Sequence, residues 1–310
     1  MELKPLSKNP KVCISISCLD EEETIGNLLD DLKAQSYKNL EVTIVDDGST
    51  DKTVEIAKAK GAKVFINNPG RQGPAVGWNK GAKNSNAEIV GTLDADNRIT
   101  DRDFVKKSVA AFDSKTIAVR TKLKSMQENW IMKAVSDPEG ISLEPRFSRR
   151  DIYLQLGGFP EIGFGEDRLY AMAVDAFAQK NGLKVALADT FFSGHAVGTL
   201  YRAYKQARWY GKSGPLYLKY FNGLQYFKEW FGVYMRTVYL LSFIGLFFGL
   251  LNPLLYLLGL PFIVILLSIL RKGIQNPWHL LKTITYFPAG IGLLHGWLLY
   301  ATAKDKGAGS

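Results

Sequence analysis

The sequence predicts an α/β domain, built on a mostly parallel sheet with helices on both faces, followed by a helical membrane region. Short apolar runs alternate with amphipathic stretches over about the first 215 of the 310 residues, which is the pattern of strand–helix–strand units. Acidic pairs follow two of the predicted strands, where open α/β sheets bind ligands. From about residue 232 onward Leu, Phe, Ile, Tyr and Gly dominate, as in membrane-spanning helices.

The first half of the domain is expected to contain three strands, each followed by a helix. The strands are predicted in VCISISCL (12–19), LEVTIVDDGS (40–49) and AKVFINN (62–68). The helices are predicted in EEETIGNLLDDLKAQ (21–35), DKTVEIAKAK (51–60) and GWNKGAKNS (77–85). The first helix has apolar residues at helical spacing and acids in its first turn, where they suit the helix dipole.

The second half of the domain has a weaker pattern. AEIVGTLDADN (87–97) predicts a fourth strand, and DRDFVKKSVAAFD (101–113) a helix. Residues 122–145 carry Gly, Pro and mixed charge, which favours a loop. A glycine-rich turn then leads into a helix that starts near Glu166, and residues 184–192 resemble a strand.

Residues 216–231 are predicted to form an amphipathic helix in the membrane interface, because aromatic residues lie on one side and charges on another. A helix packed on the soluble domain is the alternative. Residues 232–303 are predicted to form a transmembrane region, and 304–310 a tail. The expected spans are residues 233–251, 254–270 and 283–303. The second span is short for a crossing, so a re-entrant hairpin of the first two is an alternative.

The formal charge of +9 favours an anionic partner. The basic residues form no long run, which argues against nucleic acid. Several of them cluster where the chain approaches its apolar segments: Arg202, Lys205, Arg208, Lys212, Lys219, Lys228 and Arg236. A basic collar facing anionic lipid head groups explains this placement better.

Two cysteines, Cys13 and Cys18, are five residues apart in the first predicted strand. Strand alternation places them on opposite faces, so we expect two buried free thiols. The opening segment MELKPLSKNPK lacks the apolar core of a signal peptide. We therefore expect a multi-pass protein of the cell membrane with its N-terminal domain on the cytoplasmic side.

Asp94 and Asp96 lie one residue apart at the end of the fourth predicted strand. If the chain turns there, one carboxylate can hold a divalent cation while the other orients a ligand. Mg²⁺ and Mn²⁺ prefer oxygen ligands and commonly bridge to phosphates. Solvated loop acids are the simpler alternative, but the second acidic strand end, IVDDGSTD, strengthens the metal interpretation.

Four segments together resemble family 2 glycosyltransferases, over about residues 10–215. They are SISCLDEEETIGNLLDDLKAQSYKNLEVTIVDDGSTDKT, NPGRQGPAVGWNKGA, TLDADN and GGFPEIGFGED, in this order. The resemblance implies the GT-A fold, which is Rossmann-like. It also implies transfer of a sugar from a nucleotide sugar to an acceptor, with inversion at the anomeric carbon.

The resemblance implies roles for five residues on the donor side. Glu21 and Asp47 stand where the family contacts the nucleoside, and Arg71 where a basic residue approaches the donor. Asp94 matches the acid near the ribose and sugar, and Asp96 the metal-binding acid. Bound Mn²⁺ or Mg²⁺ would neutralise the leaving diphosphate.

The resemblance also places the catalytic base. Glu166 and Asp167 match the family's Glu-Asp pair, in which the aspartate takes the acceptor's proton. Acids that merely suit a helix N-terminus are the alternative. His195 matches an additional metal ligand of some GT-A enzymes, although a lone histidine is equally compatible with a structural role.

The segment KQARW, residues 205–209, is similar to the Gln-x-x-Arg-Trp element of processive membrane synthases, with Lys205 in place of the first Gln. The similarity implies that Gln206, Arg208 and Trp209 contact the diphosphate and acceptor. Arg208 would bind phosphate, and Trp209 would stack on a sugar. An amphipathic helix resting on lipid is the alternative.

These observations predict a membrane-anchored, inverting, metal-assisted hexosyltransferase. Its partners would be a UDP or GDP sugar, a lipid or lipid-linked saccharide hydroxyl, and membrane lipids, and assembly into homo-oligomers is compatible with them. Alternatives are a polyprenyl-phosphate sugar synthase, a processive polysaccharide synthase and a non-catalytic sugar-binding membrane module. A phosphate acceptor is already anionic and needs no base, so the Glu166–Asp167 pair argues against the first.

Overall fold

The computed structural model describes residues 1–67, 72–126, 129, 139–162, 165–195, 199–213, 289–291, 293–295 and 298–299. The chain is divided into two compact units. The first unit comprises Met1–Ser125 and Glu139–His195, and the second comprises Met126–Pro138 and Ala196–Ser310. Among the described residues, no helix has the length and apolar character to cross a bilayer. The predicted interfacial helix and the first two predicted spans lie outside the described residues, as does most of the third.

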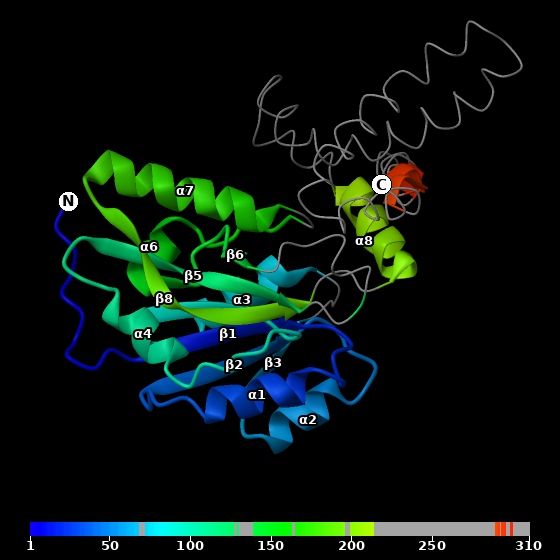
Figure 1. Cartoon of the computed structure of the whole chain (residues 1–310), viewed down its shortest axis with the longest axis horizontal. Helices are drawn as coiled ribbons and strands as arrows, with labels where there is room; N and C mark the ends of the chain where they lie inside the picture. Colours follow the sequence, from blue (N-terminus) through cyan, green and yellow to red (C-terminus); the bar gives the residue numbers. More distant parts are fainter. Residues whose placement is uncertain are drawn as a thin grey trace, which may run out of the picture. The chain divides into compact units, whose positions relative to one another are not determined.

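The first unit is built on a mixed sheet, ordered β3-β2-β1-β4-β7-β5-β6, with β8 pairing β5 (Figure 1). Its strands are β1 (Val12–Cys18), β2 (Leu40–Asp46), β3 (Lys63–Ile66), β4 (Ile89–Asp94), β5 (Thr116–Met126), β6 (Glu139–Ile141), β7 (Phe147–Arg149) and β8 (Lys184–His195). The pairs β1–β2, β1–β4 and β2–β3 are parallel, whereas β4–β7, β5–β7 and β5–β6 are antiparallel. The prediction of a mostly parallel sheet therefore holds for β1 to β4 and fails beyond them.

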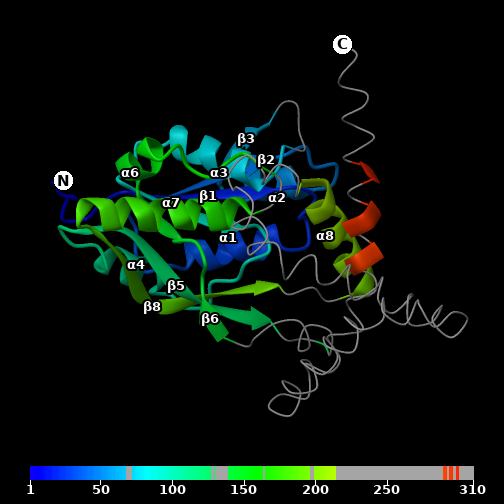
Figure 2. The same cartoon turned by 90° about the horizontal axis from the view of Figure 1, so that it is seen from above.

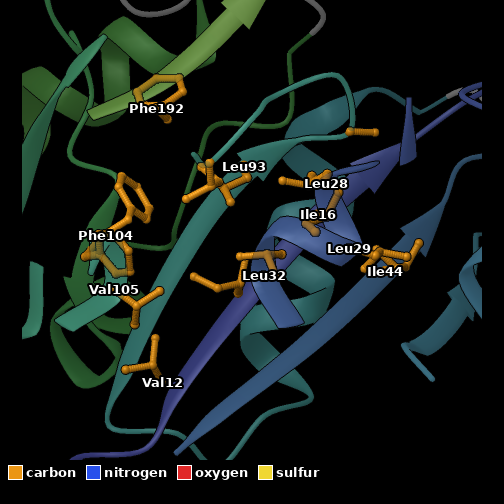
Figure 3. Packing of buried hydrophobic residues seen from close by; sticks show 14 of the residues in the cluster. Val12, Ile16, Leu28, Leu29, Leu32, Ile44, Leu93, Phe104, Val105 and Phe192 are labelled. Atoms are coloured by element: carbon orange, nitrogen blue, oxygen red, sulfur yellow. The ribbon is translucent and has the colours of Figure 1, made fainter. Parts of the chain in front are cut away.

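Helices cover both faces of this sheet, as predicted (Figures 1 and 2). They are α1 (Ile25–Lys33), α2 (Thr53–Ala59), α3 (Pro74–Lys83), α4 (Phe104–Ala110), α6 (Arg150–Gln155) and α7 (Glu166–Asn181). Alternation along β4 sends Ile89 into one apolar cluster and Val90 into another. The Ile89 cluster includes residues of α1, α2 and α4 (Figure 3), and the Val90 cluster includes residues of α3, α6 and α7.

Helix α3 lies unusually close to β1 because two of its residues are glycines. A Cβ added at Gly81 would lie 2.0 Å from Ser15 Oγ, and one at Gly77 would lie 2.4 Å from Ser17 Oγ. Ser15 is completely buried and donates a hydrogen bond to the carbonyl of Trp78, at 3.1 Å. The glycine spacing thus sets how close the helix packs to the strand whose carboxyl end borders the acidic residues.

The second unit contains α8 (Leu200–Ser213), which includes the KQARW segment. Ala207 of this helix is buried against Ala289 and Leu293. The hydroxyl of Tyr204 lies 2.5 Å from Nδ1 of His295. The buried face of α8 therefore packs against described residues that belong to the third predicted span.

Candidate active site

The register of the parallel strands brings the two acidic pairs to one edge of the sheet. Cys18, at the end of β1, is the register partner of Asp46 in β2, and Ser17 is the partner of Asp94 in β4. The carboxyl end of β1 is therefore flanked by both acid pairs. This is the edge at which open α/β sheets bind ligands, as expected from the sequence.

Asn97 shapes the turn that carries Asp94 and Asp96. Its side-chain oxygen accepts a hydrogen bond from the Asp94 N–H at 3.0 Å, and its own N–H donates to the Asp94 carbonyl at 3.0 Å. Its amide nitrogen also donates to Asp96 Oδ1 at 3.3 Å. Asn97 is buried, and we did not identify this role from the sequence. It converts an alternating strand end into a turn that presents the two acids.

The electrostatic surroundings of Asp96 suit a cation. Burial, together with the charges of Asp94 and Glu21, raises the pKa of Asp96 to about 7. Carboxylate oxygen is the ligand type that Mg²⁺ and Mn²⁺ prefer, so a divalent cation fits this position. Within the described part of the chain, no group of three or more His, Cys, Asp or Glu side chains converges to hold a metal. Water and a bound diphosphate can supply further ligands, and His195, whose side chain is not among those described, stays a predicted one.

Arg146 acts on both groups of predicted site residues, the Asp94–Asp96 turn and the Glu166–Asp167 pair, and we did not identify it from the sequence. Its guanidinium lies 3.7 Å from Asp94 Oδ2 and 2.7 Å from Glu144 Oε1. The guanidinium carbon lies 4.2 Å from the centre of the Phe192 ring. The side chain is 9% exposed, so its charge acts with little screening from water.

Glu166 and Asp167 begin α7, directly after Gly165, which has a φ of +82°. Burial and the charge of Asp167 raise the pKa of Glu166 to about 8. Burial also raises the pKa of Asp167, whereas the backbone N–H of Arg168 and the charge of Arg146 lower it. The predicted helix start is confirmed, and both acids belong to the same electrostatic cluster as Asp94.

Asn79 of α3 fixes the segment that leads to these acids. Its amide nitrogen donates to the Phe159 carbonyl at 2.8 Å, and its oxygen accepts from the Phe159 N–H at 2.9 Å. The same oxygen accepts from the hydroxyl of Tyr153 at 2.8 Å. Asn79 and Phe159 are both 2% exposed. This anchor was also not identified from the sequence, because it joins residues 80 positions apart.

Asp47 and Glu21, predicted to contact the nucleoside, have partners within the protein. Asp47 accepts hydrogen bonds from the Gly73 N–H at 2.8 Å and from Asn67 Nδ2 at 3.2 Å. These bonds join the end of β2 to both sides of residues 68–71. Glu21 Oε2 accepts from the hydroxyl of Thr24 at 2.7 Å. Both acids follow strands whose carboxyl ends form the acidic edge of the sheet, and their contact with a nucleoside stays a prediction.

The other predicted site residues are placed less fully. Arg71 lies outside the described residues. His195 ends β8, but its side chain is not among those described. Gln206 and Arg208 are exposed on α8, and Trp209 follows them in the same helix. These three belong to the second unit, so their roles toward the acidic edge stay predictions.

Residues 13–165 match the family model described as Glycosyl transferase family 2. An uncharacterized glycosyltransferase of Haemophilus influenzae is 38% identical over 78 residues, which are 24% of this chain and 31% of that protein. Poly-beta-1,6-N-acetyl-D-glucosamine synthase of Staphylococcus aureus is 34% identical over 91 residues, which are 28% of this chain and 22% of that protein. The matched segments thus span well under half the length of these two relatives.

Solved structures of other proteins share the fold. The mannosyltransferase PcManGT of Pyrobaculum calidifontis, solved with GDP-Man and Mn²⁺, superposes with a TM-score of 0.55 at 16% identity, covering 94% of this chain and 90% of that chain. S. aureus TarS 1-349 with UDP-GlcNAc superposes with a TM-score of 0.50 at 22% identity, covering 66% of each chain. The mixed sheet with helices on both faces is therefore of the GT-A type, and residues 13–165 of this chain form a glycosyltransferase family 2 domain.

Proposed function

We propose that the chain is a membrane-anchored inverting glycosyltransferase. It transfers a sugar from a nucleotide-diphosphate sugar to a hydroxyl of a lipid or lipid-linked saccharide. The observation that carries this proposal is the acid cluster at one sheet edge, where Arg146 lies between Asp94 and Glu144 and its charge acts on both Asp96 and Asp167. Such a cluster brings a cation site and a base within electrostatic reach of each other.

On the donor side, the carboxyl ends of β1, β2 and β4 supply the binding groups. Glu21 and Asp47 border the nucleoside position, and Asp94 the ribose and sugar. Asp96 would hold Mn²⁺ or Mg²⁺. When bound, the metal would act as a Lewis acid that neutralises charge on the departing diphosphate. Two solved structures of this fold are complexes with UDP-GlcNAc and GDP-Man, which supports a donor of this chemical class.

On the acceptor side, Asp167 acts as the general base. A hydroxyl is a poor nucleophile, and its proton must leave as the new anomeric bond forms. Burial raises the pKa of Asp167, which makes its carboxylate a stronger base than that of an exposed aspartate, and the charge of Arg146 opposes that rise. One base serves a single displacement, which inverts the anomeric carbon, and no carboxylate nucleophile is needed.

The acceptor and the membrane location are inferred from the second unit. Arg208 and Gln206 would contact phosphate groups, and Trp209 would stack on a sugar. The apolar segments 233–251, 254–270 and 283–303 would hold the domain at the cytoplasmic face of the membrane, close to a lipid-linked acceptor.

A processive polysaccharide synthase is the second candidate. It is favoured by the KQARW segment on α8 and by the matched segment of the S. aureus poly-beta-1,6-N-acetyl-D-glucosamine synthase. Three short spans are few for a polymer channel, so this candidate requires that several subunits build one together. The length of the product made from one acceptor distinguishes it from single transfer.

The test is thermal unfolding of the purified full-length chain against a panel of nucleoside diphosphates and nucleotide sugars, with and without Mn²⁺ or Mg²⁺. A ligand that binds only the folded state raises the melting temperature. We expect a metal-dependent rise with UDP or GDP compounds that is lost in Asp96→Ala. A flat panel with folded protein would overturn the proposal in favour of a non-catalytic module.

A further inference from the structure

The carboxyl group of Glu166 is buried and incompletely hydrogen-bonded. Glu166 is 6% exposed, and its Oε2 has no hydrogen-bond partner among the described residues. It lies in the first turn of α7, next to Asp167. A buried polar atom without a partner is rare and costly in a folded protein, so this oxygen is a candidate for contact with a ligand.

The charged groups that act on Glu166 are themselves acids. They come from three elements: Asp167 on α7, Asp94 at the end of β4 and Glu144 before β7. Its own backbone N–H favours the anion, and so does the N-terminal end of the helix dipole. Burial and these three like charges outweigh these effects, so the pKa of Glu166 is raised.

We propose that Glu166 is a neutral carboxylic acid at neutral pH and that its O–H donates a hydrogen bond to a hydroxyl oxygen of the saccharide bound beside Asp167. This inference rests on the proposed glycosyl transfer. The Oε2 atom, which has no hydrogen-bond partner among the described residues, is the structural basis for this contact. The surrounding carboxylates explain why Glu166 keeps its proton. Glu166 is thus a positioning residue that orients the sugar while Asp167 takes the proton.

A neutral acid at this position has a consequence for the base. If Glu166 were ionised, a second negative charge beside Asp167 would raise the pKa of the base and reduce its ionised fraction at neutral pH. As a neutral donor, Glu166 adds no charge that would oppose ionisation of Asp167. The two adjacent acids therefore have different tasks: Glu166 donates a hydrogen bond, and Asp167 takes the proton of the acceptor.

The protonation state can be tested without substrate. Infrared spectra of the full chain are compared between wild type and Glu166→Gln at neutral pH. We expect a protonated carboxylic acid band in the wild type that is missing in Glu166→Gln and that fades as the pH rises above about 8. The matched control is Glu55→Gln, an exposed glutamate in the first turn of α2, which should not change this band. Identical spectra for wild type and Glu166→Gln would overturn the proposal.

The binding role is tested by transfer from UDP-GlcNAc and GDP-Man across pH. Glu166→Ala should lower kcat/KM about tenfold, the equivalent of one lost hydrogen bond. Glu166→Gln, which keeps a neutral donor, should recover most of that loss and remove the decline of the wild type above about pH 8. If kcat/KM falls as far in Glu166→Gln as in Glu166→Ala, a neutral hydrogen-bond donor at this position does not restore transfer, and the donor role is wrong.

Failure of the proposed function gives a different result. If the wild-type chain transfers no sugar from either donor and binds neither, glycosyl transfer from these donors is wrong and the saccharide contact falls with it. The infrared band then still decides whether Glu166 is neutral.

Discussion

Replacing Asn79 with Ala tests whether α3 holds the segment that precedes the proposed base. Asn79 makes two hydrogen bonds to the backbone of Phe159 and one to the hydroxyl of Tyr153, all between 2.8 and 2.9 Å. Alanine removes both polar atoms at once. The Phe159 N–H, the Phe159 carbonyl and the Tyr153 hydroxyl would then be left without these partners in the core.

The expected cost is large. Asn79 is 2% exposed, and Phe159 and Tyr153 are equally buried, so water cannot readily replace the lost bonds. An unsatisfied buried polar group costs about 1–3 kcal/mol, and relaxation around the small cavity will recover part of the sum. We therefore expect Asn79→Ala to lower the free energy of unfolding by about 3–5 kcal/mol, a large part of the total of a typical domain.

The assay is urea unfolding of the full chain followed by circular dichroism. The matched control is Asn84→Ala at the end of the same helix, where the side chain is exposed and donates one bond to the Lys80 carbonyl. This control should cost less than about 1 kcal/mol. Equal midpoints for the two variants would refute the reasoning, because burial would then not determine the cost.

The remaining predictions concern the helix–strand contact, the two proposed functional acids and pH. Gly81→Ala should destabilise the protein by about 1–3 kcal/mol because its Cβ would meet Ser15, and adding Ser15→Gly should recover stability in urea unfolding. Asp167→Asn should abolish sugar transfer while the nucleotide-induced rise in melting temperature persists. If this variant keeps the turnover of the wild type, Asp167 is not the base. Asp96→Ala should weaken nucleotide binding measured by calorimetry with Mn²⁺, and unchanged affinity would remove it as the metal ligand. Because the pKa of Glu166 is raised, its protonation stabilises the folded state below about pH 4.5, and this contribution is lost as the pH rises through about 8. The free energy of unfolding of Glu166→Gln, relative to that of the wild type, should therefore rise by up to about 5 kcal/mol between about pH 5 and 9. A difference between the two proteins that stays the same across this pH range would contradict the prediction.

The part of the fold that the sequence predicts well is the part determined by local patterns. The strands β1 to β4 appear as apolar runs of four to seven residues between helices with helical apolar spacing. The prediction that both acid pairs share one sheet edge is confirmed because parallel strands that follow helices present their carboxyl ends together. The start of α7 at Glu166 was predictable for a similar reason, since a glycine-rich turn precedes it.

The antiparallel half of the sheet was not predictable in the same way. Strand β7 has three residues and is fixed by pairing with β4, where Gly91 is the register partner of Phe147. A segment this short has no readable period, and its partner lies more than 50 positions away. The predicted loop of residues 122–145 therefore contains the end of β5 and all of β6. Arg146 was missed because its importance comes from this non-local pairing.

The acid cluster itself argues that the site is built for ligands. Burial raises the pKa of Asp96, Glu144, Glu166 and Asp167, so each carboxyl is less readily ionised than in water. Arg146 opposes this rise at three of them but does not remove it. A fold optimised for stability alone would replace such a cluster with apolar residues or pair each acid. A divalent cation at Asp96 would relieve the repulsion among the acids around it, so metal and nucleotide together should raise the melting temperature more than the sum of their separate effects.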